Sequence, residues 1–299
     1  MSSYRFVTLD VFTSVPFGGN QLAVFPDARG IPEEMLLAIT REFNYPETTF
    51  CYPPENPAHA KRVRIFTPAG EVPFAGHPTV GTAVALHAAG QAPTRMILEE
   101  GVGPVLVTVR STDEAVAFAQ FSVARLPETG PAAPSRGMLA EILSINAEDI
   151  LTTPFAPQTL SCGLPFLLVP LRSVRAVSRA RVRLEKWEAT LKNSWAPQIF
   201  IFARDPDGGD THFRARMFAP GLNVAEDPAT GSANACFAGY LAARAPQSSG
   251  TLAWTVDQGI EMGRPSRLEI EADTADGVLT AVRVGGSAVL VSEGTMNVR

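Results

Sequence analysis

A repeat within the chain constrains its fold more than any other feature of the sequence. Residues 77–85, HPTVGTAVA, match residues 227–235, DPATGSANA, at the Pro, the Gly and two Ala positions, and Thr or Ser follows the Gly. The preceding segments RIFTPAGEV (64–72) and RMFAPGLNV (216–224) share Arg, Phe, Pro and Val in step. Two adjoining matches in the same order, about half a chain apart, indicate that a whole domain was duplicated.

The length of the chain agrees with this interpretation, because 299 residues are enough for two domains that each bury a core of their own. The segment 124–137, ARLPETGPAAPSRG, is dense in Pro, Gly and Ser and is the best candidate for a linker. We therefore expect an N-terminal domain over residues 1–124 and a C-terminal domain over residues 125–286.

Strand-like segments dominate both halves, and each half contains one helix that has almost no polar face. These helices are TVGTAVALHAAG (79–90) and GSANACFAGYLAA (231–243), and both open at the repeated turns. A helix that is apolar nearly all round is buried nearly all round. In a domain made mostly of strands, a curved sheet can supply that cover. The sequence predicts an α+β architecture of two similar domains, each a strongly curved sheet around a central helix.

The charge and hydropathy of the chain exclude several classes of partner. The formal net charge is −5, which gives no basic surface for nucleic acid. The Arg-rich run 172–187 also contains Glu185 and has arginines at helical spacing, so we interpret it as the solvated face of a helix. No apolar stretch approaches the roughly 20 residues of a membrane span, and the N-terminus does not resemble a signal peptide. We expect a soluble protein of the cytoplasm.

The cysteines point to neither a disulfide framework nor a zinc site. Cys51, Cys162 and Cys236 lie far apart in the sequence and form no Cys-x-x-Cys pair. We expect no bound metal, and a reducing cytoplasm is the default compartment for such a chain.

The starts of the two apolar helices are the candidate functional sites. A helix start leaves backbone N–H groups without partners and carries partial positive charge, and small residues there let an anion come close. If the two domains face each other, both starts reach one cleft, which would suit a small acid. Ser232 and Thr82 would add hydroxyl donors, with His77 and Asp227 just outside each helix. The alternative is structural, since Asp and Ser often do no more than cap helices.

Five motifs together resemble the PhzF-like family, named for the isomerase of phenazine biosynthesis. They are DVFTSVPFGGNQLAVF (10–25), PETTF (46–50), RIFTPAGEVPFAGHPTVGTA (64–83), FAPGLNVAEDPATGSANA (218–235) and QGIEMGRPSRL (258–268). The resemblance implies the diaminopimelate-epimerase-like fold, with two pseudo-symmetric domains and an active site in the cleft between them. It also implies a homodimer, no cofactor or metal, and a last strand, residues 287–299, that returns to the first domain.

The resemblance assigns roles to individual residues. In the family the catalytic base is the glutamate of the Glu-Thr-Thr-Phe motif, which here is Glu47, although from the residues alone it would be interpreted as a surface turn residue. We expect apolar Phe50 and Phe74 beside this carboxylate. Further positions that line the family's active site are occupied here by Gly76, His77, Asp227, Gly231 and Ser232. One departure is Gln21, where the family most often has Pro.

We therefore expect a cofactor-independent isomerase that moves a proton between carbons of a small carboxylate. Glu47 would take and return the proton, His77 and Asp227 would orient the substrate, and Gly231 with Ser232 would hold its carboxylate. The sequence does not choose the substrate. Two alternatives stay open, a one-carbon epimerase or racemase and a small-acid-binding protein without turnover. Relatives of the same fold that epimerise with two thiols carry one Cys at each helix start, where this chain has His77 and Asp227.

Overall fold

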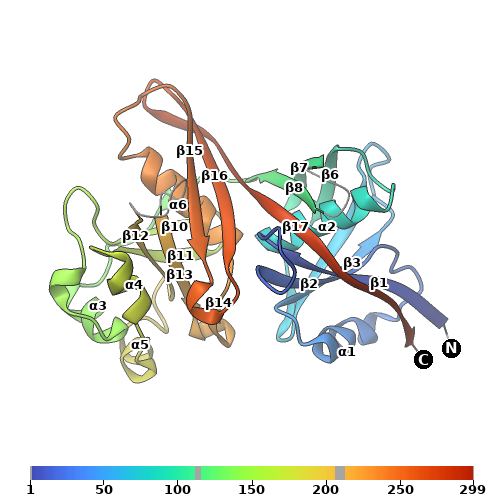
Figure 1. Cartoon of the computed structure of the whole chain (residues 1–299), viewed down its shortest axis with the longest axis horizontal. Coiled ribbons are helices and arrows are strands. Elements are labelled where there is room, and N and C mark those ends of the chain that lie inside the picture. The colour runs from blue at the N-terminus through green and yellow to red at the C-terminus, as the bar shows by residue number, and fades with distance from the viewer. Residues whose placement is uncertain (1, 112–115, 206–212, 299) are drawn as a thin grey trace. The chain divides into compact units, whose positions relative to one another are not determined.

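The computed structural model describes residues 2–111, 116–205 and 213–298 (Figure 1). Contacts divide the chain into two compact units. Unit 1 comprises Met1–Ala124 and Val284–Arg299, and unit 2 comprises Arg125–Arg283. From the sequence we expected the second domain to begin at residue 125 and the chain to rejoin the first domain near residue 287.

Unit 1 is a closed barrel with one helix inside it and one outside. Its elements are β1 (Ser2–Val11), β2 (Asn20–Phe25), α1 (Glu33–Phe43), β3 (Glu47–Tyr52), β4 (Lys61–Thr67), β5 (Gly70–Val72), α2 (Gly76–Ala88), β6 (Arg95–Glu100), β7 (Gly103–Ser111), β8 (Val116–Ser122) and the C-terminal part of β17 (Val278–Val298). Strands pair in the circular order β1, β2, β3, β4, β6, β7, β8 and β17, and β17 pairs with β1 again. The β2–β3 and β4–β6 pairs are parallel.

Helix α2 is the core of this barrel. It contacts β1, β2, β3, β6, β7 and β8, and every residue from Gly76 to Leu86 is buried. The helix packs so closely on β1 and β2 at Gly81 that an added Cβ would lie 2.5 Å from the Leu22 side chain and 2.7 Å from that of Val11. The hydroxyls of Thr49 and Thr82, 2.9 Å apart, tie α2 to β3. Helix α1 instead packs on Phe25, Phe50 and Phe66.

Unit 2 contains β9 (Glu128–Thr129), α3 (Arg136–Leu143), β10 (Gln158–Ser161), β11 (Pro165–Pro170), α4 (Val174–Arg179), α5 (Leu184–Thr190), β12 (Gln198–Arg204), β13 (Phe213–Ala219), β14 (Val224–Asp227), α6 (Gly231–Ala242), β15 (Gly250–Gln258), β16 (Ser266–Ala275) and the start of β17. Three 3-10 turns join them, at Ala147–Asp149, Pro220–Leu222 and Ile260–Met262. Its central helix is α6, which contacts β10, β11, β15 and β16 and buries all but one of its residues.

The two units repeat one topology. The parallel pairs β2–β3 and β4–β6 of unit 1 recur as β11–β12 and β13–β15 in unit 2, and even the register agrees, because Arg62 pairs with Glu99 and Arg214 with Asp257. The pairing of β17 with β1 recurs as that of β9 with β10. The prediction of an α+β fold, with two similar curved sheets that each surround a helix, is confirmed.

The Arg-rich run differs from the prediction of a single helix. It forms two short helices, α4 and α5, separated by residues 180–183. The backbone N–H groups of Arg181 and Arg183 donate instead to the carbonyls of Leu143 and Ile142, at 2.9 and 2.8 Å. These are carbonyls at the C-terminus of α3, which have no partner within their own helix. The run is interrupted because its backbone closes off the end of α3.

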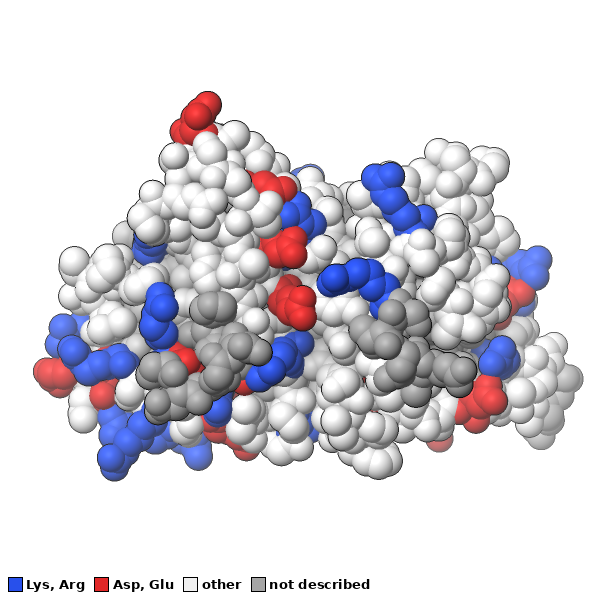
Figure 2. All heavy atoms as spheres, turned by 45° about the horizontal axis from the view of Figure 1, so that its top comes forward, with Lys and Arg blue, Asp and Glu red and all other residues white. Residues whose placement is uncertain are grey.

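Among the described residues on the face in view, Lys and Arg side chains lie near Asp and Glu side chains (Figure 2). Among the described residues no helix is both long enough and apolar enough to cross a membrane.

Candidate functional site

Glu47 and His77 meet in unit 1. Glu47 is the first residue of β3 and its Oε2 lies 3.0 Å from Nε2 of His77, with side chains 15% and 5% exposed. The separation is that of an ion pair, but the geometry is not that of a hydrogen bond. Within the described parts of the chain, this buried Glu47 oxygen has no hydrogen-bond donor. It therefore keeps lone pairs that can accept a proton.

The partners of His77 determine which of its ring nitrogens carries the proton. Nδ1 lies 3.1 Å from the side-chain amide nitrogen of Asn20, which can only donate, so Nδ1 accepts. A neutral ring then carries its proton on Nε2, which lies 3.2 Å from the backbone carbonyl of Gln21 as well as beside Glu47. The carbonyl of Gln21, the position where the sequence departs from the family pattern, is thus part of the site.

The expectation that Phe50 lies beside Glu47 is wrong. Side chains alternate between the two faces of a strand, so Glu47 shares its face with Thr49, whose hydroxyl contacts α2. Phe50 points to the opposite face, where it stacks on Phe25 at a ring-centroid distance of 5.1 Å under α1. Phe74 packs edge-on against Phe121.

The helix starts differ from the prediction in their positions. His77 is not outside α2 but is its second residue, because α2 begins at Gly76, whereas α6 begins at Gly231, the equivalent of Gly81. As a result Thr82, predicted as a hydroxyl donor for a ligand, lies in the second turn, is fully buried and bonds to Thr49. The prediction of a ligand-binding role for Thr82 is therefore wrong.

Asp227 ends β14, four residues before α6, and belongs to a hydrogen-bonded cluster. The Thr230 hydroxyl donates to Asp227 Oδ2 at 2.5 Å, and the Gln258 amide donates to the Asp227 carbonyl at 2.8 Å and to the Thr230 hydroxyl at 3.2 Å. Asn234 donates to Gln258 Oε1 at 3.1 Å. Asp227 is therefore held in place, and Thr230, not Asp227, is the N-cap residue of α6.

The start of α6 has the features of an anion site. The side chain of Thr230 makes no capping hydrogen bond, and Gly231 and Ser232 are the first two residues of the helix. Ser232 is partly exposed, whereas Gly231 and Ala233 are buried. The start of α2, at Gly76, likewise has no side-chain cap. Uncapped N–H groups of a helix start favour a bound carboxylate or phosphate.

A buried arginine in unit 2 was not identified by sequence reasoning. Arg216, on β13, is bidentate to Glu226, with both distances 2.7 Å, and donates to the carbonyls of Val177, Ser178 and Ala180. Glu226 immediately precedes Asp227, so this arginine fixes the strand that presents Asp227. The recurrence of Arg64 and Arg216 in the repeat was the available signal, since Arg64 is likewise bidentate to Glu71 of β5.

Thiols and metal ligands are not gathered at these helix starts. Cys51 is buried in β3, and burial raises its pKa to about 12. Cys236 is in the body of α6, 3.6 Å from Cys162 between their sulfurs, and burial raises its pKa. Among the described residues no group of three or more His, Cys, Asp or Glu side chains could hold a metal ion.

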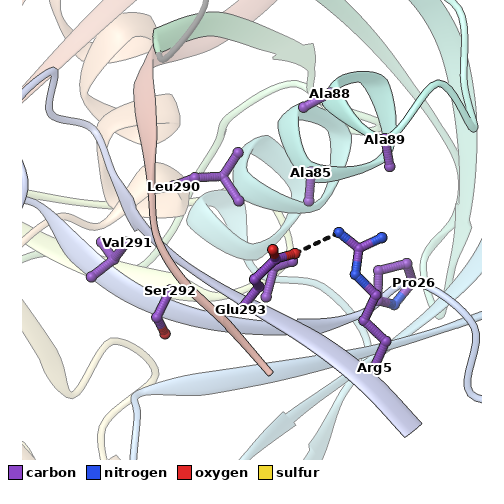
Figure 3. Close-up of a pocket in the computed structure, with 10 residues that line it drawn as sticks. Arg5, Pro26, Ala85, Ala88, Ala89, Leu290, Val291, Ser292 and Glu293 are labelled. Carbon is purple, nitrogen blue, oxygen red and sulfur yellow. Dashed lines mark hydrogen bonds and ion pairs between the residues drawn. The ribbon is translucent and has the colours of Figure 1, made fainter. Parts of the chain in front are cut away.

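A separate cavity of about 380 Å³ lies at the other end of α2 (Figure 3). It is lined by Ala85 and Ala88 of the helix, by Ala89 directly after it, and by residues of β1 and β17. The Arg5–Glu293 ion pair spans it at 2.7 Å. Because it is at the C-terminal end of α2, it is distinct from the site of Glu47 and His77.

Comparisons with known proteins agree with one another. A family model described as "Phenazine biosynthesis-like protein" (PhzC-PhzF) matches residues 9–294. An uncharacterised isomerase of Mesorhizobium japonicum is 38% identical over 99% of both chains. The trans-2,3-dihydro-3-hydroxyanthranilate isomerase of Pseudomonas fluorescens is 35% identical over 98% of this chain and 99% of its own.

Solved structures show the same relationship. A PhzF-family phenazine biosynthesis protein of Bacillus anthracis has a TM-score of 0.90 at 24% identity, with both chains fully covered. A probable proline racemase of Agrobacterium radiobacter shares the fold at 14% identity, with a TM-score of 0.61 over 99% of this chain and 93% of its own. The chain therefore belongs to the PhzC-PhzF family of phenazine biosynthesis-like proteins, and it is an isomerase, as the relatives from Mesorhizobium japonicum and Pseudomonas fluorescens are.

Proposed function

We propose that this isomerase moves a proton between two carbons of a small carboxylate substrate, with Glu47 as the group that carries the proton. One observation supports this most directly. Glu47 Oε2 is buried, has no hydrogen-bond donor among the described residues, and lies 3.0 Å from the His77 ring nitrogen that carries the proton. A buried carboxylate oxygen without a donor lowers the stability of the folded protein. The same oxygen is free to accept a proton from a substrate, which is what a general base requires.

The proposed reaction consists of two proton transfers. Glu47 first removes a proton from a carbon next to a double bond or carbonyl of the substrate, so the C–H electron pair becomes part of the conjugated system. The protonated Glu47 then delivers the same proton to a different carbon of that system. The products differ from the substrate only in the positions of one hydrogen and one double bond, and no electrons are gained or lost.

His77 has a supporting role in this proposal. Asn20 holds the ring through Nδ1, and the Gln21 carbonyl accepts from Nε2–H, so the ring is fixed with Nε2 3.0 Å from Glu47 Oε2. Unit 2 supplies the uncapped start of α6, where Gly231 and Ser232 would bind the substrate carboxylate and Asp227 would bind another polar group. That both sets of residues face one cleft stays a prediction from the repeat.

The names of two relatives supply the substrate class that we propose. The enzymes of Pseudomonas fluorescens and Pseudomonas aeruginosa, 35% and 34% identical to this chain, are named for trans-2,3-dihydro-3-hydroxyanthranilate, an unsaturated amino acid. This compound is the first substrate to test, followed by related unsaturated hydroxy and amino acids.

The test is Glu47→Gln. Glutamine keeps the shape of Glu47 but cannot accept a proton, so turnover should fall by about a hundred- to ten-thousand-fold while calorimetric affinity changes little. Glu34→Gln, an exposed carboxylate of α1, is the matched control and should leave the rate unchanged. Ser232→Ala should weaken binding more than it slows the chemical step. If Glu47→Gln turns over within about tenfold of the parent, Glu47 is not the proton carrier.

A second function has one observation in its favour, since a solved structure from Pseudomonas aeruginosa described as a predicted epimerase is 33% identical, with a TM-score of 0.79 over 99% of this chain and 100% of its own. An epimerase would return the proton to the carbon that lost it. In heavy water it would exchange one hydrogen of the substrate without moving a double bond. Proton NMR of the reaction distinguishes the two functions.

A further inference from the structure

Glu100 is a buried carboxyl group that the proposed reaction does not use. It ends β6 and is 7% exposed. The next residue, Gly101, packs so closely on Pro73 that an added Cβ would lie 2.7 Å from the Pro73 backbone. One carboxyl oxygen lies 2.8 Å from the hydroxyl of Thr79 in the first turn of α2, and the other has no hydrogen-bond partner within the described ranges.

The single hydroxyl proton of Thr79 limits the protonation state of the Glu100 carboxyl group. The Thr79 hydroxyl lies 2.8 Å from Glu100 Oε1 and also 2.8 Å from the carbonyl of Ala75, the N-cap residue of α2. A hydroxyl has one proton to donate, and a carbonyl can only accept. Both contacts can therefore be full two-centre hydrogen bonds only if Glu100 is protonated and donates to Thr79, while Thr79 donates to Ala75.

The duplicated unit has an amide at the position equivalent to Glu100, and this amide also contacts a threonine hydroxyl. Because Arg62 pairs with Glu99 and Arg214 pairs with Asp257, the residues that follow, Glu100 and Gln258, occupy equivalent positions.

In unit 2 the fully buried Gln258 donates to the hydroxyl of Thr230, which donates to Asp227. In both units the next residue is a glycine that packs closely on a proline, Gly101 on Pro73 and Gly259 on Pro228, although the two prolines are not equivalent in the repeat. An acid in its neutral form is the closest chemical equivalent of that amide donor.

We propose that Glu100 is a positioning residue, a neutral carboxylic acid that donates to Thr79 and thereby holds the first turn of α2, with His77, in place beside Glu47. The inference rests on the proposed function only where it concerns the reaction. If Glu100 lost its proton, its buried negative charge would lie next to the first turn of α2. The Thr79 hydroxyl would then donate to the Glu100 carboxylate in place of the Ala75 carbonyl.

The charged groups around Glu100 do not neutralise it. Those that line the same cavity of about 610 Å³ are Arg62 and Arg64 of β4, Glu71 of β5, Glu99 of β6, and Glu55 and His59 of the segment between β3 and β4. His77 lies two residues from Thr79 on α2, and the buried thiol of Cys51 approaches from β3. Glu100 forms an ion pair with none of these described residues. Burial, opposed by the Thr79 hydrogen bond, raises the pKa of Glu100 to about 8.

The test begins with the protonation state and needs no substrate. Infrared spectroscopy should show a protonated carboxyl band at neutral pH that is lost with a midpoint near pH 8 and is absent in Glu100→Gln. The NMR signals of the His77 ring should shift with the same midpoint in the wild type and lose that transition in Glu100→Gln. Glu99→Gln, on the neighbouring residue of β6, should keep both transitions.

Reciprocal variants test the positioning role. Gln258→Glu should create a second carboxyl transition, in unit 2. Glu100→Ala should lower turnover of trans-2,3-dihydro-3-hydroxyanthranilate about tenfold or more, whereas Glu100→Gln should keep turnover near that of the wild type. In a pH profile, the wild type should lose activity above about pH 8 and Glu100→Gln should not.

Two results would overturn the inference. One is an infrared spectrum in which Glu100 is ionised at neutral pH, and the other is His77 ring NMR signals that do not change as Glu100 titrates. A wild type without turnover would contradict the proposed function alone, because the infrared and NMR results stand without it.

Discussion

The clearest quantitative prediction concerns Arg216 and its counterpart in the repeat, Arg64. The Arg216 side chain is 4% exposed and its partner Glu226 is 16% exposed. Arg64 is 20% exposed, and its partners Glu33 and Glu71 are 71% and 42% exposed. The two arginines therefore make similar contacts at very different depths.

The expected cost of substitution follows from that depth. Arg216→Met leaves the buried carboxylate of Glu226 without its bidentate partner and removes one donor from each of three backbone carbonyls. Removal of one partner of a buried ion pair typically costs about 3 to 5 kcal/mol. Arg64→Met leaves carboxylates that water can reach, so we expect a loss of about 1 kcal/mol. Replacing both Arg216 and Glu226 with apolar residues should recover part of the stability, since no unpaired charge remains.

Urea unfolding followed by tryptophan fluorescence is the appropriate assay. All three tryptophans, Trp187, Trp195 and Trp254, lie in unit 2, so their signal reports on the unit that contains Arg216. The midpoint for Arg216→Met should fall by about 1 to 2 M urea. Equal losses for Arg216→Met and Arg64→Met, or a double variant less stable than Arg216→Met alone, would refute the reasoning from burial.

Three further predictions use other parts of the structure. Since the pKa of Glu100 is raised from 4.5 to about 8 by burial, the folded state binds the extra proton, and its contribution to stability should be lost as pH rises through this range, by at most about 1.4 kcal/mol per pH unit. Denaturant titrations should show this slope in the wild type and a shallower one in Glu100→Gln. Gly81→Ala should destabilise unit 1 by about 1 to 3 kcal/mol in thermal unfolding because its Cβ would overlap Leu22, and a neutral effect would contradict the close packing. In a thiol titration Cys162 should react first, because the other two thiols are buried with raised pKa values, and fast labelling of all three in the folded protein would disagree with the structure.

The parts of the fold that depend on apolar pattern could be predicted from the sequence. The two central helices were visible because each lacks a polar face, and the repeat placed both in equivalent surroundings. The residue at which each helix starts, and the face of a strand to which each side chain points, were harder to predict. The alignment placed Thr82 opposite Ser232, but α2 starts five residues earlier in that alignment than α6, so Thr82 is buried in the second turn. Phe50 was misplaced for a similar reason, since adjacency in sequence puts neighbours on opposite faces of a strand.

Interactions between distant residues were the least predictable part of the site. The contact of Glu47 with His77 was not predicted, because the family resemblance assigned both residues to the active site without pairing them and 30 positions separate them in the sequence. Glu100 carries no sequence signal of its own. Its equivalence to Gln258 appears only when the strand registers of the two units are compared.

The closing strand of unit 1 affects how the protein can fold during synthesis. The segment that pairs with both β1 and β8 lies between Val284 and Val298, at the end of the chain. The ribosome therefore releases all of unit 2 before unit 1 receives its final strand. Until then β1 and β8 present unpaired edges, which are sites of aggregation unless another chain or a chaperone covers them. A shortened C-terminus should thus damage the half of the protein that is made first.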